Sequence, residues 1–241
     1  MDGIGNRIAI GAPSTNIGYV RVFDLSTFPG GEWEQVGLDI IGKEGDRFGN
    51  DVSITDTGDI IAIGTSGIVV TDGGKYVNTY ELINGKTWTL HGSVSGSNKS
   101  FGRVVSLSGD GSVMAVGSPY EGDADEGATY IYKRIGRKWI LSGSQPISGV
   151  EEDSRIGFSV AVSGDGSTIA IGSKSNNIDT RVVIWDGTEF LQHGRDLFDG
   201  YGASVSLSFD GSTIVIGTGF DSSTYLYAGK TTVYDWEEDK K

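Results

Sequence analysis

The chain has 241 residues with no cysteine, 39 glycines and 4 prolines, and its 32 acidic and 19 basic side chains give a formal net charge of −13. The lack of thiols excludes disulfides, thiolate metal sites and cysteine nucleophiles, and the negative field disfavours nucleic acid and anionic lipid as partners. No apolar run approaches the length of a membrane span, so we expect no membrane insertion, and we also expect no signal peptide within these 241 residues.

One sequence unit recurs along the chain with a period near 50 residues. A glycine closes the second apolar run of each unit at spacings of 53, 53, 55 and 45 residues, and a later aromatic residue recurs at 55, 51 and 51 residues. Two independent markers with one period establish a repeat. The markers are Gly11, Gly64, Gly117, Gly172 and Gly217, and Trp33, Trp88, Trp139 and Phe190.

Each complete unit predicts four short strands. The first follows an aromatic-Gly or Ile-Gly pair and alternates small polar with apolar residues, as in 204–208, which is the period of a strand with two different faces. An Asp-Gly turn such as 110–111 leads into a second strand that is apolar on both faces, as in 60–63, and such a strand must be covered on both sides. A polar loop, a third strand and a fourth strand with the aromatic residue complete the unit.

The first unit lacks its first strand and the last unit lacks its fourth, which predicts 18 strands in total. Four-stranded sheets that stack face to face bury both faces, and their twist turns the stack around an axis. We therefore predict an all-β fold: one β-propeller domain over 1–241 with about five four-stranded blades, the terminal blades having three strands. The repeats span approximately 1–46, 47–99, 100–154, 155–199 and 200–241.

The strands missing from the two ends do not complete one blade together, so simple closure of the ring fails. Three alternatives follow from this pattern: three-stranded terminal blades, a chain cut from a longer protein, or strands supplied by a neighbouring chain. An open sheet edge is also a docking site for another strand.

The Phe-Gly pairs at 48–49 and 101–102, together with Gly-Ala-Pro at 11–13 and Gly-Ser-Pro at 117–119, resemble FG-GAP repeats, the units of the integrin α-subunit propeller and of related surface proteins. The resemblance covers essentially the whole chain. It implies a binding, adhesion or scaffolding module that is extracellular or at the cell surface, with a protein or glycan partner, within a larger chain or assembly.

Catalysis finds little support in the residues, and we expect that the protein is not an enzyme. His91 and His193 occupy equivalent positions in different units, and no serine stands in a nucleophile elbow. One alternative is a glycan-active enzyme, which needs carboxylates that converge at the central channel. Another is a structural subunit of a larger assembly.

Many FG-GAP repeats hold Ca²⁺ between the first two strands, in a loop with Asp or Asn at its first, third, fifth and ninth positions. The third unit keeps only the fifth of these, Asp110; the first and third are Ser106 and Ser108, and the ninth is Met114. One carboxylate with two hydroxyls is a poor Ca²⁺ site. We therefore expect a plain Asp-Gly hairpin.

A second acidic cluster, Asp123, Asp125 and Glu126, lies between the second and third strands of the third unit. Alternating acids with glycine supply the oxygen ligands that Ca²⁺ prefers. The spacing matches no complete motif, and the cluster occurs in one unit. We expect a solvated loop and no cofactor, with a weak Ca²⁺ site as the alternative.

Aromatic residues in or beside the loops between second and third strands are the stronger functional lead. These loops emerge on one face, where binding residues concentrate, and aromatic rings stack on sugars or anchor protein partners. The alternative is that the last two of them cover the rim of the final blade. The candidate ligand-binding residues are Tyr120, Phe220, Tyr225 and Tyr227.

Overall fold

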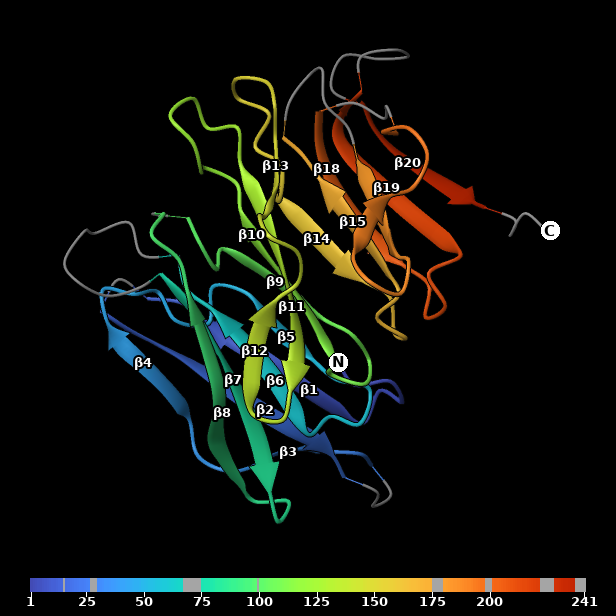
Figure 1. Cartoon of the computed structure of the whole chain (residues 1–241). Helices are drawn as coiled ribbons and strands as arrows, with labels where there is room; N and C mark the ends of the chain where they lie inside the picture. Colours follow the sequence, from blue (N-terminus) through green and yellow to red (C-terminus); the bar gives the residue numbers. More distant parts are fainter. Residues whose placement is uncertain are drawn as a thin grey trace.

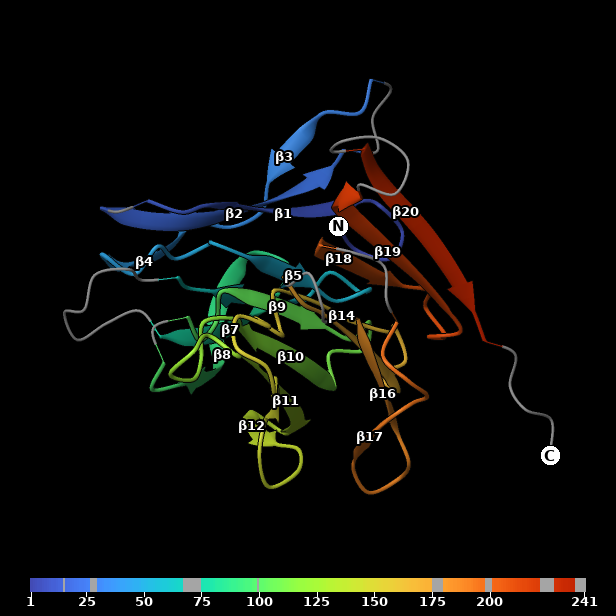
Figure 2. The same cartoon turned by 90° about the horizontal axis from the view of Figure 1, so that it is seen from above.

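The computed structural model describes residues 1–14, 16–26, 30–66, 75–98, 100–174, 180–197, 201–221 and 228–236. Over these residues the chain forms five antiparallel sheets and no helix. The sheets follow one another in chain order around a common centre, so that the first and the last lie at the two ends of a fan (Figures 1 and 2). We call them blades 1 to 5. The described chain has no helix of the length and apolarity that crossing a bilayer requires.

Blade 1 contains β1 (Arg7–Ala12), β2 (Ile17–Leu25), β3 (Trp33–Gln35) and β4 (Ile40–Glu44). Blade 2 contains β5 (Val52–Ile54), β6 (Ile60–Gly64), β7 (Tyr76–Ile83) and β8 (Thr87–Ser95). Blade 3 contains β9 (Val104–Leu107), β10 (Val113–Ser118), β11 (Ala128–Ile135), β12 (Lys138–Leu141) and β13 (Ile147–Ser148). Blade 4 contains β14 (Ser159–Val162), β15 (Thr168–Gly172), β16 (Arg181–Trp185) and β17 (Phe190–Gln192). Blade 5 contains β18 (Tyr201–Leu207), β19 (Thr213–Asp221) and β20 (Ala228–Asp235).

The 20 strands of the described chain fill the 18 positions that the repeat predicts. β3 and β4 both pair with β2, and β12 and β13 both pair with β11, so the fourth strand of blades 1 and 3 is interrupted and counts twice. In blade 2 the fourth strand, β8, runs through with a register shift between Thr79 and Tyr80 of β7. Blade 1 has no first strand and blade 5 has no fourth among the described residues, which confirms three strand positions in each terminal blade.

The first strands lie side by side at the centre (Figure 2). Side chains of one blade accept N–H groups from the edge of the next. β9 pairs only with β10, so the N–H groups on its other edge need different acceptors. Ser53 Oγ of β5 accepts the N–H of Leu107 at 2.9 Å, and Ser106 Oγ of β9 accepts the N–H of Val162 at 3.0 Å. The small polar residues that alternate along the first strands therefore link neighbouring blades.

Backbone hydrogen bonds also connect the turns that precede the second strands. Each turn bonds to the turn of the next blade with a donor–acceptor distance between 2.8 and 3.2 Å. This chain of bonds ties all five blades together at one end of the molecule. It runs from Gly3 N to Asp56 O, from Asp56 N to Gly109 O, from Gly109 N to Gly164 O, and from Asp165 N to Phe209 O.

The Phe-Gly pair and the glycine that closes the second strand form one contact between blades. Phe101 is fully buried, and Gly102 has a φ of +82°, a conformation that favours glycine. The Gly102 carbonyl comes so close to Gly64 of the preceding blade that a Cβ on Gly64 would lie 2.2 Å from its oxygen. The same approach joins Gly11 to Gly49 and Gly117 to Gly157.

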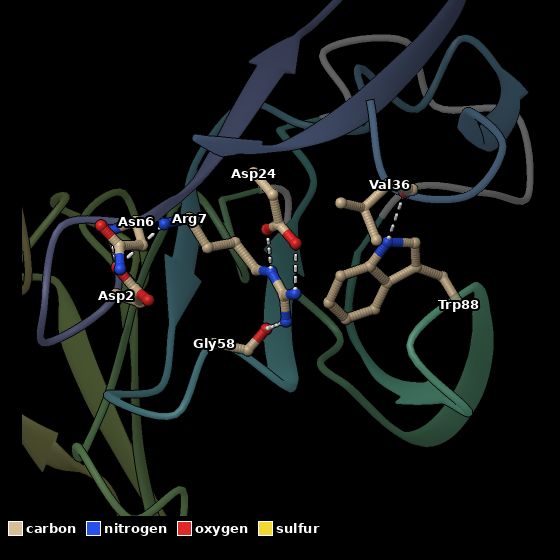
Figure 3. A network of polar contacts seen from close by, with 7 residues as sticks. All are labelled: Asp2, Asn6, Arg7, Asp24, Val36, Gly58 and Trp88. Carbon is tan, nitrogen blue, oxygen red and sulfur yellow. Dashed lines mark hydrogen bonds and ion pairs between the residues drawn. The ribbon is translucent and has the colours of Figure 1, made fainter. Parts of the chain in front are cut away.

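The aromatic residue of the fourth strand also reaches back to the preceding blade. Trp88 Nε1 donates to the Val36 carbonyl of blade 1 at 3.0 Å (Figure 3). Trp139 Nε1 donates to Thr79 Oγ1 of blade 2 at 3.0 Å. Both sequence markers of the repeat therefore record contacts between blades rather than within one.

Arg7 links blades 1 and 2 on the inner side. Its guanidinium pairs with Asp24 of the same blade, and its Nη1 donates to the Gly58 carbonyl in the turn of blade 2 at 2.8 Å (Figure 3). An arginine fork suits this double task, because it presents several donors in fixed directions.

The core consists of four clusters, one between each pair of neighbouring blades. All five residues of β6 and all six of β10 are buried, as expected for an apolar strand that is covered on both faces. Ala62, Ala115 and Ala170 are fully buried at the crowded position where the repeat carries alanine. Each interior blade is thus stabilised by the blades on its two sides.

We expect Gly64→Ala to lower the free energy of unfolding by about 2 kcal/mol, because its methyl group would collide with the Gly102 carbonyl and overpacking costs about 1–3 kcal/mol. Gly219→Ala is the matched control, since a Cβ there would meet no atom within 4 Å. We expect it to change stability by less than about 0.5 kcal/mol. Urea unfolding followed by circular dichroism measures both, and equal losses would contradict the close approach.

Candidate functional site

A pocket of about 390 Å³ lies at the centre of the fan, where the first strands begin. Blades 2 to 5 all contribute to it. The loops between second and third strands leave the sheets at this same end, because each second strand runs antiparallel to the first. We call this region the central mouth. Its lining consists of Asn50, Asp51, Arg103, Val104, Phe158, Ser159 and Ser204.

Asp51 is the one carboxyl among the described residues that line the central mouth. Its Oδ2 accepts the N–H of Val105 from blade 3 at 2.8 Å, and its Oδ1 accepts the N–H of Val52 at 3.0 Å. Burial raises the pKa of Asp51 to about 6, because the carboxylate loses hydration, and the two backbone donors offset this effect in part. Asp51 thus joins two blades and faces no second carboxyl in the lining.

Three cations lie over aromatic rings at the central mouth. The guanidinium carbons of Arg103 and Arg155 are each 5.4 Å from the ring centroid of Tyr120. Lys174 Nζ is 4.7 Å from the ring centroid of Phe158. These distances lie within the range of cation–π attraction. Three cation–aromatic contacts thus lie at one end of a protein whose net charge is −13.

The two arginines on Tyr120 differ in their remaining contacts. Arg155 Nη2 pairs with Asp153 at 2.7 Å, and its Nε is buried without a hydrogen-bond acceptor. Within the described part of the chain, no carboxylate forms an ion pair with Arg103. Arg103 also lines the pocket, so it is the cation best placed to meet a ligand there.

Tyr120 is the one predicted binding residue whose side chain the structure describes. It is half-buried, and its N–H donates to Ser100 Oγ at 2.9 Å, which anchors the start of the loop. Phe220 pairs with Tyr201 in the β18–β19 ladder, and its side chain lies outside the described part. Tyr225 and Tyr227 lie outside the described residues altogether.

The acidic loop of blade 3 is bound through its backbone to the segment that leads into blade 4. The carbonyl groups of residues 124–126 accept N–H groups from residues 153–156. The Glu126 carboxylate turns back and accepts the N–H of Ala124 at 3.1 Å. No three histidine or acidic side chains of the described chain are grouped as a metal site. The Ca²⁺ site at Asp123, Asp125 and Glu126 stays a prediction.

The Asp-Gly turns between first and second strands are hairpins in which the aspartate caps its own turn. Asp110 Oδ1 accepts the Ser112 N–H at 2.8 Å and the Ser108 hydroxyl at 2.6 Å. Asp165 makes the same two bonds in blade 4, to Ser167 at 2.9 Å and Ser163 at 2.6 Å. The oxygen that a metal would use is thus engaged within the turn.

The two histidines lie in different blades. His91 Nδ1 in β8 is 3.1 Å from Glu81 Oε2 of the neighbouring strand. The His193 ring follows β17 and lies 6.0 Å from the Trp236 ring. They form no common site.

The comparisons with known proteins support the repeat family and the fold. Residues 86–132 match the FG-GAP repeat model, which confirms the resemblance over the fourth strand of blade 2, the first two strands of blade 3 and the first part of its third strand. The structure is similar to Kuenenia stuttgartiensis hydrazine synthase, with 13% identity and a TM-score of 0.60 over 98% of this chain and 62% of that chain. It is also similar to a "putative 6-phosphogluconolactonase" of Bacteroides fragilis, with 14% identity and a TM-score of 0.62 over 96% of this chain and 68% of that one.

At such identities the likeness shows the fold alone: the protein has a β-propeller fold, and it spans about two-thirds of the length of each similar chain. No curated protein matches it in sequence.

Sequence reasoning does not single out the pocket residues Asp51 and Arg103, nor the cations Arg155 and Lys174. Asp51, Arg103 and Arg155 stand 52 residues apart along the chain, and Lys174 follows the second strand of blade 4. Only the stacking of blades places Asp51 beside Arg103 in the pocket, and Arg103 and Arg155 beside one ring. One signal was present: Asp51 is an acid at the position where blades 4 and 5 carry Ser159 and Ser204.

Asp51→Ser tests the buried carboxyl. The folded pKa of about 6 exceeds the unfolded value of about 3.9, so at intermediate pH the folded state holds a proton that the unfolded state has lost. Relative to the variant, the wild type should therefore lose about 2 kcal/mol of unfolding free energy from about pH 4 to pH 7. In the variant this contribution is absent, while a serine still accepts an N–H, as Ser159 does from Val205 at 3.0 Å. Urea titrations across this range measure it, and parallel profiles for the two proteins would contradict the assignment.

Calorimetry with CaCl₂ tests the acidic loop. We expect no heat beyond dilution, because the loop carbonyls that would complete a Ca²⁺ shell already accept N–H groups. A heat of binding that disappears in Asp123→Asn would instead establish the Ca²⁺ site.

Proposed function

We propose that this protein is a non-catalytic binding module that takes a protein or glycan partner at the central mouth. The observation that carries the proposal is the Tyr120 ring, whose centroid lies 5.4 Å from the guanidinium carbons of both Arg103 and Arg155, with Arg103 also lining a pocket shared by four blades. Binding residues on a propeller of this repeat type would be presented on such a face by the rigid sheets beneath it. As the FG-GAP resemblance implies, we place the protein outside the cell or at its surface.

The chemistry of the mouth favours a carboxylate-bearing ligand with a flat apolar face. An aromatic ring stacks on the apolar face of a sugar, and a free guanidinium binds a carboxylate through two parallel hydrogen bonds. Arg103 offers such a fork next to Tyr120. An acidic sugar meets both requirements in one small group, whereas the net charge of −13 would repel an extended polyanion.

The glycan-active alternative has Asp51 as its one candidate acid at the mouth. Canonical glycoside hydrolysis uses two carboxyl groups about 5–10 Å apart. Both oxygens of Asp51 accept backbone N–H groups, and the described lining holds no second carboxyl. These observations support a binding role over hydrolysis at this site.

A glycan array with neutral, sialylated and uronic-acid probes tests the proposal. We expect the wild type to bind acidic probes, and Tyr120→Ala or Arg103→Ala to weaken that binding at least tenfold, since each removes one element of the paired recognition. Phe209→Ala is the control, because Phe209 is an exposed aromatic in a turn at the opposite end of the sheets.

Binding that survives both substitutions at the mouth would contradict the assignment of the site. Release of sugar from any probe during incubation would support the glycan-active alternative. Binding of an acidic protein partner, lost in the same two variants, would keep the site and change the class of ligand.

A further inference from the structure

The central mouth repeats one pair of positions in each of the three interior blades. The entrance position directly follows the glycine of the Phe-Gly or Ile-Gly pair, and its residues in blades 2, 3 and 4 all line the pocket of the mouth. The loop position stands two or three residues after the glycine that closes the second strand. The entrance residues are Asn50, Arg103 and Phe158, and the loop residues are Ser66, Tyr120 and Lys174.

The protein itself holds the three loop residues in place. In each blade the backbone N–H of the loop residue donates to the segment that leads into the first strand of the same blade, with a donor–acceptor distance between 2.9 and 3.3 Å. The bonds run from Ser66 N to Asp46 O, from Tyr120 N to Ser100 Oγ, and from Lys174 N to Ser154 O. Side chains that are fixed in advance lower the entropy cost of binding a ligand.

In blade 2 the pair is neutral, and its two members bind each other. Ser66 Oγ donates to Asn50 Oδ1 at 2.7 Å. Asn50 Nδ2 donates to the Arg103 carbonyl of blade 3 at 2.8 Å, so both ends of the amide are engaged within the protein. The blade 2 pair therefore carries no charge for a ligand and shows how closely the entrance and loop positions approach each other.

Blades 3 and 4 place a cation and an aromatic ring at the same two positions, with the roles exchanged. In blade 3 the entrance residue Arg103 is the cation, and its guanidinium carbon lies 5.4 Å from the ring centroid of Tyr120. In blade 4 the entrance residue Phe158 is the ring, and Lys174 Nζ lies 4.7 Å from its centroid. A cation–π contact holds a cation in position without neutralising it.

Both cations keep their charge for a ligand. Within the described residues, no carboxylate forms an ion pair with Arg103 or with Lys174. Arg103 and the Phe158 ring that Lys174 contacts line one pocket of about 390 Å³, a volume in the range of ligand-binding pockets. A single acidic group bound at Arg103 leaves Lys174 without an anion, so the pocket suits a ligand that carries two acidic groups.

We propose that Phe158 and Lys174 form a second subsite of the central mouth, and that its ligand is a short acidic oligosaccharide with acidic groups on two neighbouring sugar units. This inference rests on the proposed function, in which Arg103 and Tyr120 form the first subsite and bind one acidic sugar. The Arg103 fork selects a planar carboxylate, whereas the ammonium of Lys174 acts as a point charge. The net charge of −13 opposes a long polyanion, so the ligand is short.

NMR titration of the whole chain with three small probes tests the proposal. The probes are a single uronic acid, a disaccharide of two uronic acids, and a mixed disaccharide of one uronic acid and one neutral sugar. We expect the disaccharide of two uronic acids to bind at least about tenfold tighter than the other two probes, because it alone engages both cations. The mixed disaccharide controls for size, since it has the same number of sugar units and one acid fewer.

Lys174→Gln removes the charge of the second subsite alone. We expect it to weaken binding of the disaccharide of two uronic acids about tenfold, to the level of the mixed disaccharide, and to leave binding of the mixed disaccharide unchanged. Lys174→Arg retains the charge and should retain the preference. Lys133→Gln is the matched control, because Lys133 Nζ lies 3.0 Å from the ring centroid of Trp185 in a contact outside the pocket, and it should change none of the three affinities.

Three results would overturn the second subsite, and they differ in what they say of the first. Equal affinities of the wild type for the two disaccharides would remove the second subsite and leave the first in place. A Lys174→Gln variant that binds all three probes equally more weakly would show that Lys174 acts on the mouth as a whole. A wild type that binds no acidic probe would overturn the proposed function, and the second subsite with it. In the first two cases the wild type still binds the single uronic acid, which separates them from the third.

Discussion

The close approach of each Phe-Gly pair to the second strand of the preceding blade is the contact on which the rest of the structure depends. It places the Gly102 carbonyl where Gly64 can have no side chain, and it buries Phe101 between the two sheets. Because glycine allows this approach at several junctions, the first strands come near enough for short side chains to span the space between them. Ser53 and Ser106 then accept the N–H groups of the next inner edge, which leaves those edges satisfied.

The central mouth follows from the same contact. Its lining residues stand at the start of each first strand, and they meet only because the blades are held at this spacing. The repeat fixes the positions of the blades, and residues that differ between repeats give the mouth its individual side chains. Asp51, Val104, Ser159 and Ser204 share one repeat position, yet only the first carries a carboxyl whose pKa burial raises. Binding specificity on such a scaffold is expected to reside in positions where the blades differ.

The sequence predicts the fold well because its two markers report contacts between blades. Gly11, Gly64 and Gly117 recur where one sheet meets the next, as do Trp88 and Trp139, so the period of the markers follows the stacking of the sheets. The structure has 20 strands at the 18 predicted positions because the fourth strand is interrupted in two blades. In blade 1, for example, β3 and β4 pair with β2 on either side of a break. No residue pattern in the sequence predicts that break, because it depends on the local register of the strands.

The candidate site is harder to predict for a physical reason. Tyr120 stands in a loop, and the loop position alone suggested a binding role. Its partner Arg103 precedes the first strand of blade 3, and its partner Arg155 precedes the first strand of blade 4. Both lie near the Tyr120 ring only because the two sheets are stacked. Burial of Asp51 likewise depends on the neighbouring strand that supplies Val105. The net charge of the whole chain gives no sign of these cation–aromatic contacts.

Hydrogen exchange at the inner edges tests the central claim most directly. The N–H groups of Val105, Leu107, Val162 and Val205 point away from their own sheets, and their acceptors are side chains of the preceding blade. If the junctions hold the blades at this spacing, these four amides will exchange as slowly as amides within the β-ladders. Exchange as fast as that of exposed loop amides would show that the blades are not joined in this way and would contradict the account.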